Sequence, residues 1–129
     1  MSKFTLKRID SVKGKIKIFK LLVNGNCEFD AFCEVLERKK KDNVIGGLFA
    51  TLEGYANLKM LPGTRFKELK RDKSDPIKDY EIKSGNYRTY LFKDPNGGIV
   101  IFGGARKNQK SDIKRFRAIK HDYIKNTHK

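Results

Sequence analysis

The fold is decided by the stretch from residue 80 to residue 102, which contains two consecutive turns. It reads Tyr80-Glu81-Ile82-Lys83, Ser84-Gly85-Asn86, Tyr87-Arg88-Thr89-Tyr90-Leu91-Phe92, Asp94-Pro95-Asn96-Gly97-Gly98, Ile99-Val100-Ile101-Phe102. Turn residues between apolar runs predict antiparallel strands near 77–83, 86–93 and 98–104. Residues 87–92 and 99–102 are apolar on both faces, so these two strands are expected in the sheet centre, covered on both sides.

From about Cys27 to Pro62, apolar residues recur with the period of a helix, and after Pro62 they alternate with polar residues. The period predicts one helix from about Cys27 to Lys40 and a second from Asp42 or Asn43, either of which could cap it, to just before Pro62. The basic run Arg38-Lys39-Lys40-Lys41 is interpreted as a solvated helix end. Together the two helices predict an αα-hairpin.

Shorter alternating segments predict strands on either side of this hairpin. Residues 15–23 are expected to form one strand and residues 66–70 another, whereas the polar residues 1–13 are expected to be loose or an edge. Nothing in the chain repeats, and its 129 residues fit a single domain, 1–129.

A last helix is predicted from about Ser111, its expected N-cap, to Asn126. Its apolar face is formed by Ile113, Phe116, Ile119 and Tyr123, and a separate cationic stripe by Lys110, Lys114, Arg117 and His121. The element order predicts an α+β fold, with the helical hairpin on one face of a small antiparallel sheet and the last helix at an end or edge.

The charge balance points to an anionic partner. The chain has 30 Lys and Arg against 15 Asp and Glu, a formal net charge of +15. Two thirds of this excess lies in residues 65–129. Such an imbalance predicts attraction to nucleic acid, to an anionic membrane surface or to an acidic protein.

Several classes of protein do not fit the sequence. Cys27 and Cys33 lie six residues apart on one predicted helix, too far apart for a disulfide, and no Cys or His spacing resembles a zinc site. Apolar runs are too short for a membrane span, and the first residues do not resemble a signal peptide. We expect a cytoplasmic protein that needs no metal or other cofactor.

The predicted order of elements, with three motifs, resembles the RelE/ParE toxin superfamily. The motifs are Tyr80-Glu81-Ile82-Lys83 with Gly85-Asn86-Tyr87-Arg88, the strand Ile99–Phe102, and Arg106-Lys107-Asn108-Gln109-Lys110. The turn Asn24-Gly25-Asn26 and the final helix are similar to those of the HigB-like, phage-derived branch, and the likeness covers about residues 14–125. The resemblance implies a RelE-like fold and the toxin of a toxin–antitoxin system. Many members are ribosome-dependent messenger-RNA endonucleases that use no metal.

The resemblance also implies roles for individual residues. Lys83, Arg88, Arg106 and Lys107 match basic positions that hold the scissile phosphate in the family, and His121 is the candidate proton carrier. Further RNA contacts are expected from the cations of the last helix: Lys110, Lys114, Arg117 and Lys120. The implied partners are RNA on the ribosome and a small antitoxin with an acidic segment and a helix-turn-helix domain.

The residues leave alternatives open. Arg88 could pair with Glu81 inside the core, Lys83, Arg106 and Lys107 could be solvated, and His121 could be an ordinary surface residue. The usual proton carrier of the family is not evident; Asp112, Tyr123 and His128 are the other candidates. Its absence favours a second function, a non-catalytic binder of DNA gyrase, nucleic acid or an acidic protein.

Overall fold

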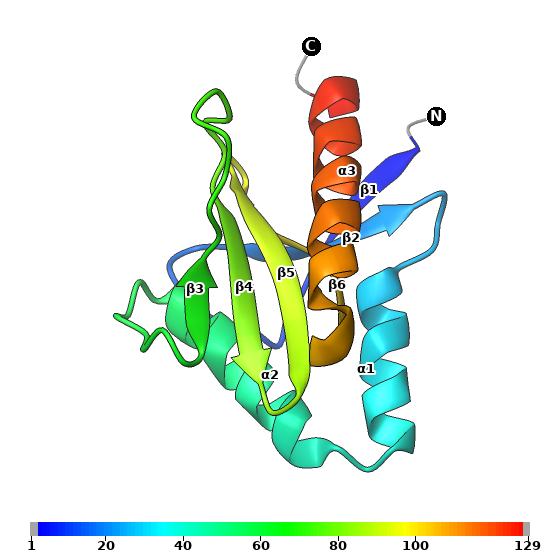
Figure 1. Cartoon of the computed structure of the whole chain (residues 1–129), viewed down its shortest axis with the longest axis vertical. Helices are drawn as coiled ribbons and strands as arrows, with labels where there is room; N and C mark the ends of the chain where they lie inside the picture. Colours follow the sequence, from blue (N-terminus) through cyan, green and yellow to red (C-terminus); the bar gives the residue numbers. More distant parts are fainter. Residues whose placement is uncertain (1–2, 128–129) are drawn as a thin grey trace.

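The computed structural model of the chain describes residues 3–127 and shows three layers, with one sheet between two layers of helices (Figure 1). The sheet has six strands in the order β1-β2-β6-β5-β4-β3. The strands are β1 (Phe4–Arg8), β2 (Ile18–Val23), β3 (Phe66–Glu68), β4 (Asp79–Ser84), β5 (Tyr87–Asp94) and β6 (Gly97–Ala105). The helices are α1 (Glu28–Arg38), α2 (Asp42–Ala56) and α3 (Gln109–Thr127), and a 3-10 turn, Arg106–Asn108, leads into α3.

The three strands predicted from the two turns are confirmed. β4 pairs with β5 and β5 with β6, both antiparallel, and Leu91, Phe92, Ile99 and Val100 are fully buried. A register shift at Tyr90 places one extra residue in β6. Apolar residues therefore cover both faces of these strands, as the sequence indicates.

The prediction of an antiparallel sheet is confirmed for β3 to β6 but not for the whole sheet, because β2 runs parallel to β6. Ile18, Phe19 and Lys20 lie beside Gly98, Ile99 and Val100. The two helices that follow β2 return the chain across one face of the sheet, and this allows a late strand to pair with it in the same direction. β1 pairs antiparallel with β2 and forms the edge of the sheet, one of the two arrangements expected for residues 1–13.

The helices cover opposite faces of the sheet. α1 and α2 pack on one face, where Phe29, Leu36, Leu48 and Leu52 are buried. α3 does not lie at an end or edge, as expected, but along the other face (Figure 1). The physical reason is that this face of β5 and β6 is also apolar and must be covered; Phe116 of α3, for example, lies with its ring centroid 5.7 Å from that of Tyr90.

Both expected helix caps differ from the structure. Ser111 lies inside α3 and its hydroxyl donates to the Asn108 carbonyl, because the 3-10 turn starts the helix earlier than predicted. Asp42 lies in the first turn of α2, whose N-cap is Lys41 without a side-chain hydrogen bond.

A buried lysine joins α3 to the segment before β4. Lys120 is 0% exposed, and its Nζ lies 2.7 Å from Asp75 Oδ2 and 2.6 Å from Asp79 Oδ1. Lys120 also donates to the Ile77 carbonyl, and Arg117 Nε lies 3.4 Å from Asp79 Oδ2. Lys120, expected to bind RNA from the helix surface, is instead enclosed by carboxylates and cannot contact a phosphate.

This cluster predicts a loss of stability in acid. Burial opposes ionisation of Asp75, but hydrogen bonds from Lys120 and the Ile77 amide outweigh it and lower the pKa of Asp75. A lowered pKa contributes stability above the unfolded value, about 3.9, and this contribution is lost as the pH falls below it. We expect the midpoint of urea unfolding to fall more between pH 5 and pH 3 for the wild type than for Asp75→Asn. Equal pH dependence of the two proteins would contradict this role of Asp75.

Candidate functional site

Lys83 and Arg88 lie opposite each other on β4 and β5, on the face that α3 covers. Lys83 is partly exposed, donates to the Gly63 carbonyl at 3.2 Å and lines a small cavity with Arg65. Arg88 is only 8% exposed, and its Nη1 donates to the carbonyls of Gly85 and Tyr87. Arg88 therefore braces its own turn, and the structure shows no ion pair with Glu81 among the contacts of residues 3–127.

Arg106 and Lys107 are exposed on the 3-10 turn that leads into α3. The Arg106 amide donates to the Asn86 carbonyl at 2.7 Å, which holds the 3-10 turn beside the β4–β5 turn. Both side chains line a cavity of about 420 Å³ together with Asn86 and Gln109. Lys83 and Arg88 do not line this cavity, so the expected phosphate-binding residues share one end of the sheet but not one pocket.

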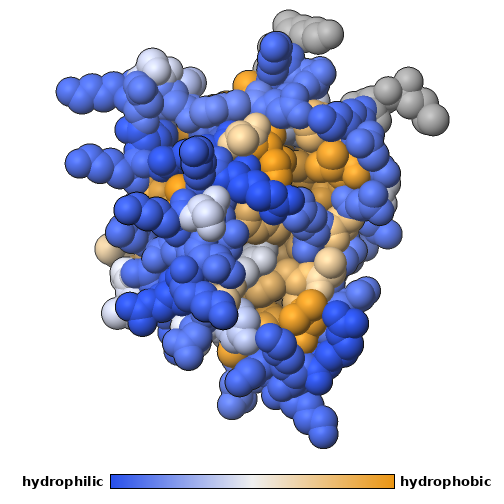
Figure 2. Space-filling model, turned by 45° about the vertical axis from the view of Figure 1, so that its right-hand side comes forward, coloured by the Kyte–Doolittle hydropathy of each residue, from blue (hydrophilic) through white to orange (hydrophobic). Residues whose placement is uncertain are grey.

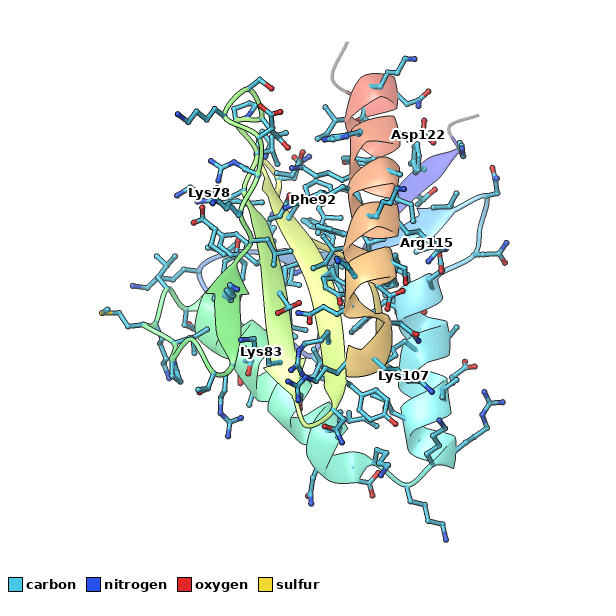
Figure 3. All side chains as sticks on the ribbon, viewed as in Figure 1. Lys78, Lys83, Phe92, Lys107, Arg115 and Asp122 are labelled. Carbon is cyan, nitrogen blue, oxygen red and sulfur yellow. The ribbon has the colours of Figure 1, made fainter. Side chains whose placement is uncertain are left out.

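Cations from four segments meet at this end of the sheet, which we name the basic end. Figure 3 shows Lys83 and Lys107 at the same end of the molecule, to which the α1–α2 connection and the β4–β5 turn also extend. The Ser84 hydroxyl donates to the Val44 carbonyl at 2.7 Å, which fixes the start of α2 against that turn. The basic end consists of Lys39, Lys40, Lys41, Arg65, Lys83, Arg106, Lys107 and Lys110.

The cations of the basic end have no acidic partners in the part of the chain that the structure describes. Among residues 3–127, none of these eight side chains forms an ion pair. By contrast, Arg115, Arg117 and Lys120 of α3 are all paired with carboxylates. The predicted stripe of α3 is thus divided: Lys110 and Lys114 are exposed without ion pairs, whereas Arg117 is held by Asp79.

Two of the candidate proton carriers, His121 and Tyr123, lie away from the basic end, whereas Asp112 lines a groove together with Lys39. His121 is exposed beside Asp75, with its Nε2 3.5 Å from Asp75 Oδ2. It lies roughly 20 Å along α3 from Arg106, given the rise of an α-helix. Tyr123 is buried in the core, and His128 lies outside the described residues. The structure therefore does not bring His121 to the cations expected to hold the phosphate.

A buried polar cluster, which sequence reasoning missed, lies beside the basic end. Glu81 is 0% exposed; its Oε2 accepts a hydrogen bond from Gln109, and its Oε1 has no partner among the described residues. The Tyr90 hydroxyl and Arg88 Nε are also buried without partners there. Such unsatisfied groups cost about 1–3 kcal/mol each and require an explanation. The signal available in the sequence was an acidic residue within a buried strand, which we considered only as a partner for Arg88.

Electrostatics keep the tyrosine of this cluster neutral. Burial raises the pKa of Tyr90, and the carboxylates of Glu81 and Asp112 raise it further, against the opposing effect of Arg88. The Tyr90 hydroxyl therefore keeps its proton at neutral pH and is a hydrogen-bond donor. The cluster thus places one carboxylate beside one neutral phenol, directly behind the side chain of Gln109.

Other kinds of site find little support within residues 3–127. No three His, Cys, Asp or Glu side chains gather there as metal ligands, and no described helix is long and apolar enough to cross a bilayer. Cys27 and Cys33 are free, and burial raises the pKa of Cys33 to about 11, which makes it a poor nucleophile.

Comparison of the chain with models of protein families, with curated proteins and with solved structures gives no match.

Proposed function

We propose that the protein binds RNA across the basic end and cleaves it without a metal, as the toxin of a RelE/ParE-like toxin–antitoxin system. The observation that carries this proposal is the set of eight cations at one end of the molecule, none with an ion pair among the described residues. An acidic segment of the antitoxin is the proposed occupant of the same surface when the toxin is inhibited.

The arrangement of these cations suits a flexible polyanion. They project from the α1–α2 connection, the turn before β3, the strand β4, and the 3-10 turn with the start of α3. Arg106 and Lys107 also stand at the start of α3, where the positive end of the helix dipole adds to their attraction for phosphate. Contacts to the backbone of RNA give affinity without sequence preference.

In this proposal, the cavity beside Arg106 and Lys107 is where the RNA's own 2′-hydroxyl attacks the phosphate. The two cations stabilise the developing charge on phosphorus. Gln109 lines this cavity and also donates to Glu81, so it separates the RNA-facing surface from the buried carboxylate. We assign Glu81 as the acceptor of the 2′ proton, which becomes accessible when RNA displaces the Gln109 side chain. The 2′-oxygen then bonds to phosphorus as the bond from phosphorus to the 5′-oxygen breaks, which leaves a 2′,3′-cyclic phosphate, and the leaving 5′-oxygen takes a proton from water.

A second function, RNA binding without cleavage, is favoured by the complete burial of Glu81 and the near-complete burial of Arg88. In that case the basic end would act as a grip on RNA, and growth would be inhibited by occupation of the target. The two functions differ in whether the bound RNA is cut.

Cleavage of messenger RNA on purified ribosomes separates these functions. We expect the wild type to cut the message and arrest growth, and Glu81→Gln to cut it about 10²- to 10⁴-fold more slowly, the usual contribution of a general base. RNA affinity should remain within about two-fold of the wild type, since Glu81 contributes no phosphate contact.

The matched control is Glu68→Gln on the neighbouring strand β3, where the carboxylate is exposed and pairs with Arg71. This variant should cleave at the wild-type rate. RNA bound tightly by the wild type but left intact would exclude the nuclease and establish the second function. Weak, salt-insensitive binding would exclude both.

A further inference from the structure

A groove of about 400 Å³ lies between α1 and α3 and opens next to the basic end. Its floor is the end of β6, Phe102 to Ala105, and Lys39 of the basic end lies on its rim. Phe32 contributes an aromatic ring from α1, while Asp112 and Arg115 come from α3. Figure 2 shows apolar surface exposed between hydrophilic side chains on the side of the molecule that carries α1.

Two glycines of β6 line this groove, which we name the slot. A Cβ on Gly103 would lie 2.3 Å from the Phe32 ring, and a Cβ on Gly104 would lie 2.4 Å from Asp112 Oδ2. The absence of side chains thus lets the ring and the carboxylate approach the strand. Arg115 stacks over Phe102 at 4.7 Å and pairs with Glu28, so its planar guanidinium is fixed at the slot. Aromatic rings and guanidinium planes are the surfaces on which unstacked RNA bases pack.

Two polar side chains of the slot, those of Asp112 and Asn108, have no partner within residues 3–127. Asp112 is half-buried, and neither it nor the side chain of Asn108 forms a hydrogen bond within residues 3–127. The pKa of Asp112 is raised, mainly by burial. Arg115 opposes this shift and Glu28 adds to it. Asn108 ends the 3-10 turn and Asp112 lies in the first turn of α3, and both line the groove. The slot therefore offers the two carboxylate oxygens of Asp112 as acceptors and the side-chain amide of Asn108 as a donor.

We propose that this slot binds a guanine base of the RNA strand whose phosphates lie on the basic end. Guanine is the only standard RNA base with two adjacent donors, N1–H and N2–H, on its Watson–Crick edge, and O6 lies beside them as an acceptor. Asp112 accepts from the two donors, and the Asn108 amide donates to O6. This assignment rests on the proposed RNA binding and adds a preference for one base.

Binding of fluorescent octanucleotides tests this assignment. We compare octauridine with octamers that carry one central guanosine, inosine, adenosine or cytidine, for the wild type, Asp112→Asn and the control Asp122→Asn. Asp122 is also on α3 but pairs with Lys3, outside the slot. The guanosine octamer should bind the wild type about ten-fold more tightly than octauridine, in line with a bidentate base contact. Inosine, which lacks the N2 amine, should lose most of this gain.

Asp112→Asn should remove the preference for guanosine and leave octauridine binding unchanged or slightly stronger, whereas Asp122→Asn should behave as the wild type. No preference in the wild type, or a preference retained in Asp112→Asn, would overturn the assignment. Failure of RNA binding as such would appear separately, as weak binding of octauridine. If guanosine monophosphate binds as tightly as the guanosine octamer, the guanine in the slot belongs to a free nucleotide, and the claim that it belongs to an RNA strand is overturned.

Discussion

Replacement of Lys120 by Met is expected to lower the free energy of unfolding at neutral pH by about 3–5 kcal/mol, the usual effect of breaking a buried ion pair. Lys120 and Asp79 are both 0% exposed, and methionine keeps most of the aliphatic length of lysine. The loss therefore comes from a buried carboxylate deprived of its main cation, with only Arg117 remaining at 3.4 Å. Urea unfolding followed by circular dichroism measures the effect.

Lys125→Met is the matched control, since Lys125 lies on the same helix, is exposed and forms no ion pair within the described residues. It should change stability by less than about 0.5 kcal/mol. Addition of Asp79→Asn to Lys120→Met should recover part of the loss, because the orphaned charge is removed. A Lys120→Met protein as stable as Lys125→Met would show that the buried cluster contributes nothing.

Reversal of three charges at the basic end should weaken RNA binding strongly. In Arg106→Glu/Lys107→Glu/Lys110→Glu, loss of three phosphate contacts should lower the affinity for single-stranded RNA about 50-fold at 0.15 M salt, because each contact releases about 0.7 counterion. Repulsion by the new carboxylates should increase this factor. The three side chains are exposed and without ion pairs within residues 3–127, so the fold should be unaffected.

A variant with the same change in net charge at the opposite end separates location from total charge. Lys13, Lys15 and Lys17 are exposed on the β1–β2 connection, where the Lys17 carbonyl accepts from the Gly98 amide at the β5–β6 turn. Lys13→Glu/Lys15→Glu/Lys17→Glu should weaken RNA binding only a few-fold, through long-range electrostatics. An equal loss in the two triple variants would mean that RNA is attracted by total charge and not by the basic end.

Local patterns in the sequence predicted most of the elements but not how they pair. Alternating apolar residues and turn signals located β4, β5 and β6, because these elements are formed by neighbours in the chain. The parallel pairing of β2 with β6 joins Ile18 to Gly98, and no local pattern encodes such a distant contact. The position of α3 was implied by the apolar character of both faces of β5 and β6, although we expected it at an end or edge.

The site was predicted less well, since the exposure of a charged side chain depends on its tertiary neighbours. Lys120 and Lys114 are both lysines of one helix, yet one is buried against Asp75 and Asp79 and the other is exposed. Lys39 to Lys41 were interpreted as a solvated helix end; the fold places Lys39 on one groove with Ala105 and Asn108. Asp112 was considered only as a proton carrier, because the groove in which it lies also requires α1, which is distant from it in sequence.

The central claim, that RNA lies across the basic end, is tested most directly by a titration of ¹⁵N-labelled protein with octauridine, followed through the backbone amide signals. The claim predicts that the largest shifts fall in three segments, 38–42, 83–88 and 104–111, with little change in residues 13–17. The shifts should diminish as salt is added, as expected for phosphate contacts. Shifts concentrated in residues 13–17 or in the loop 69–75, or spread evenly over the exposed lysines, would contradict it.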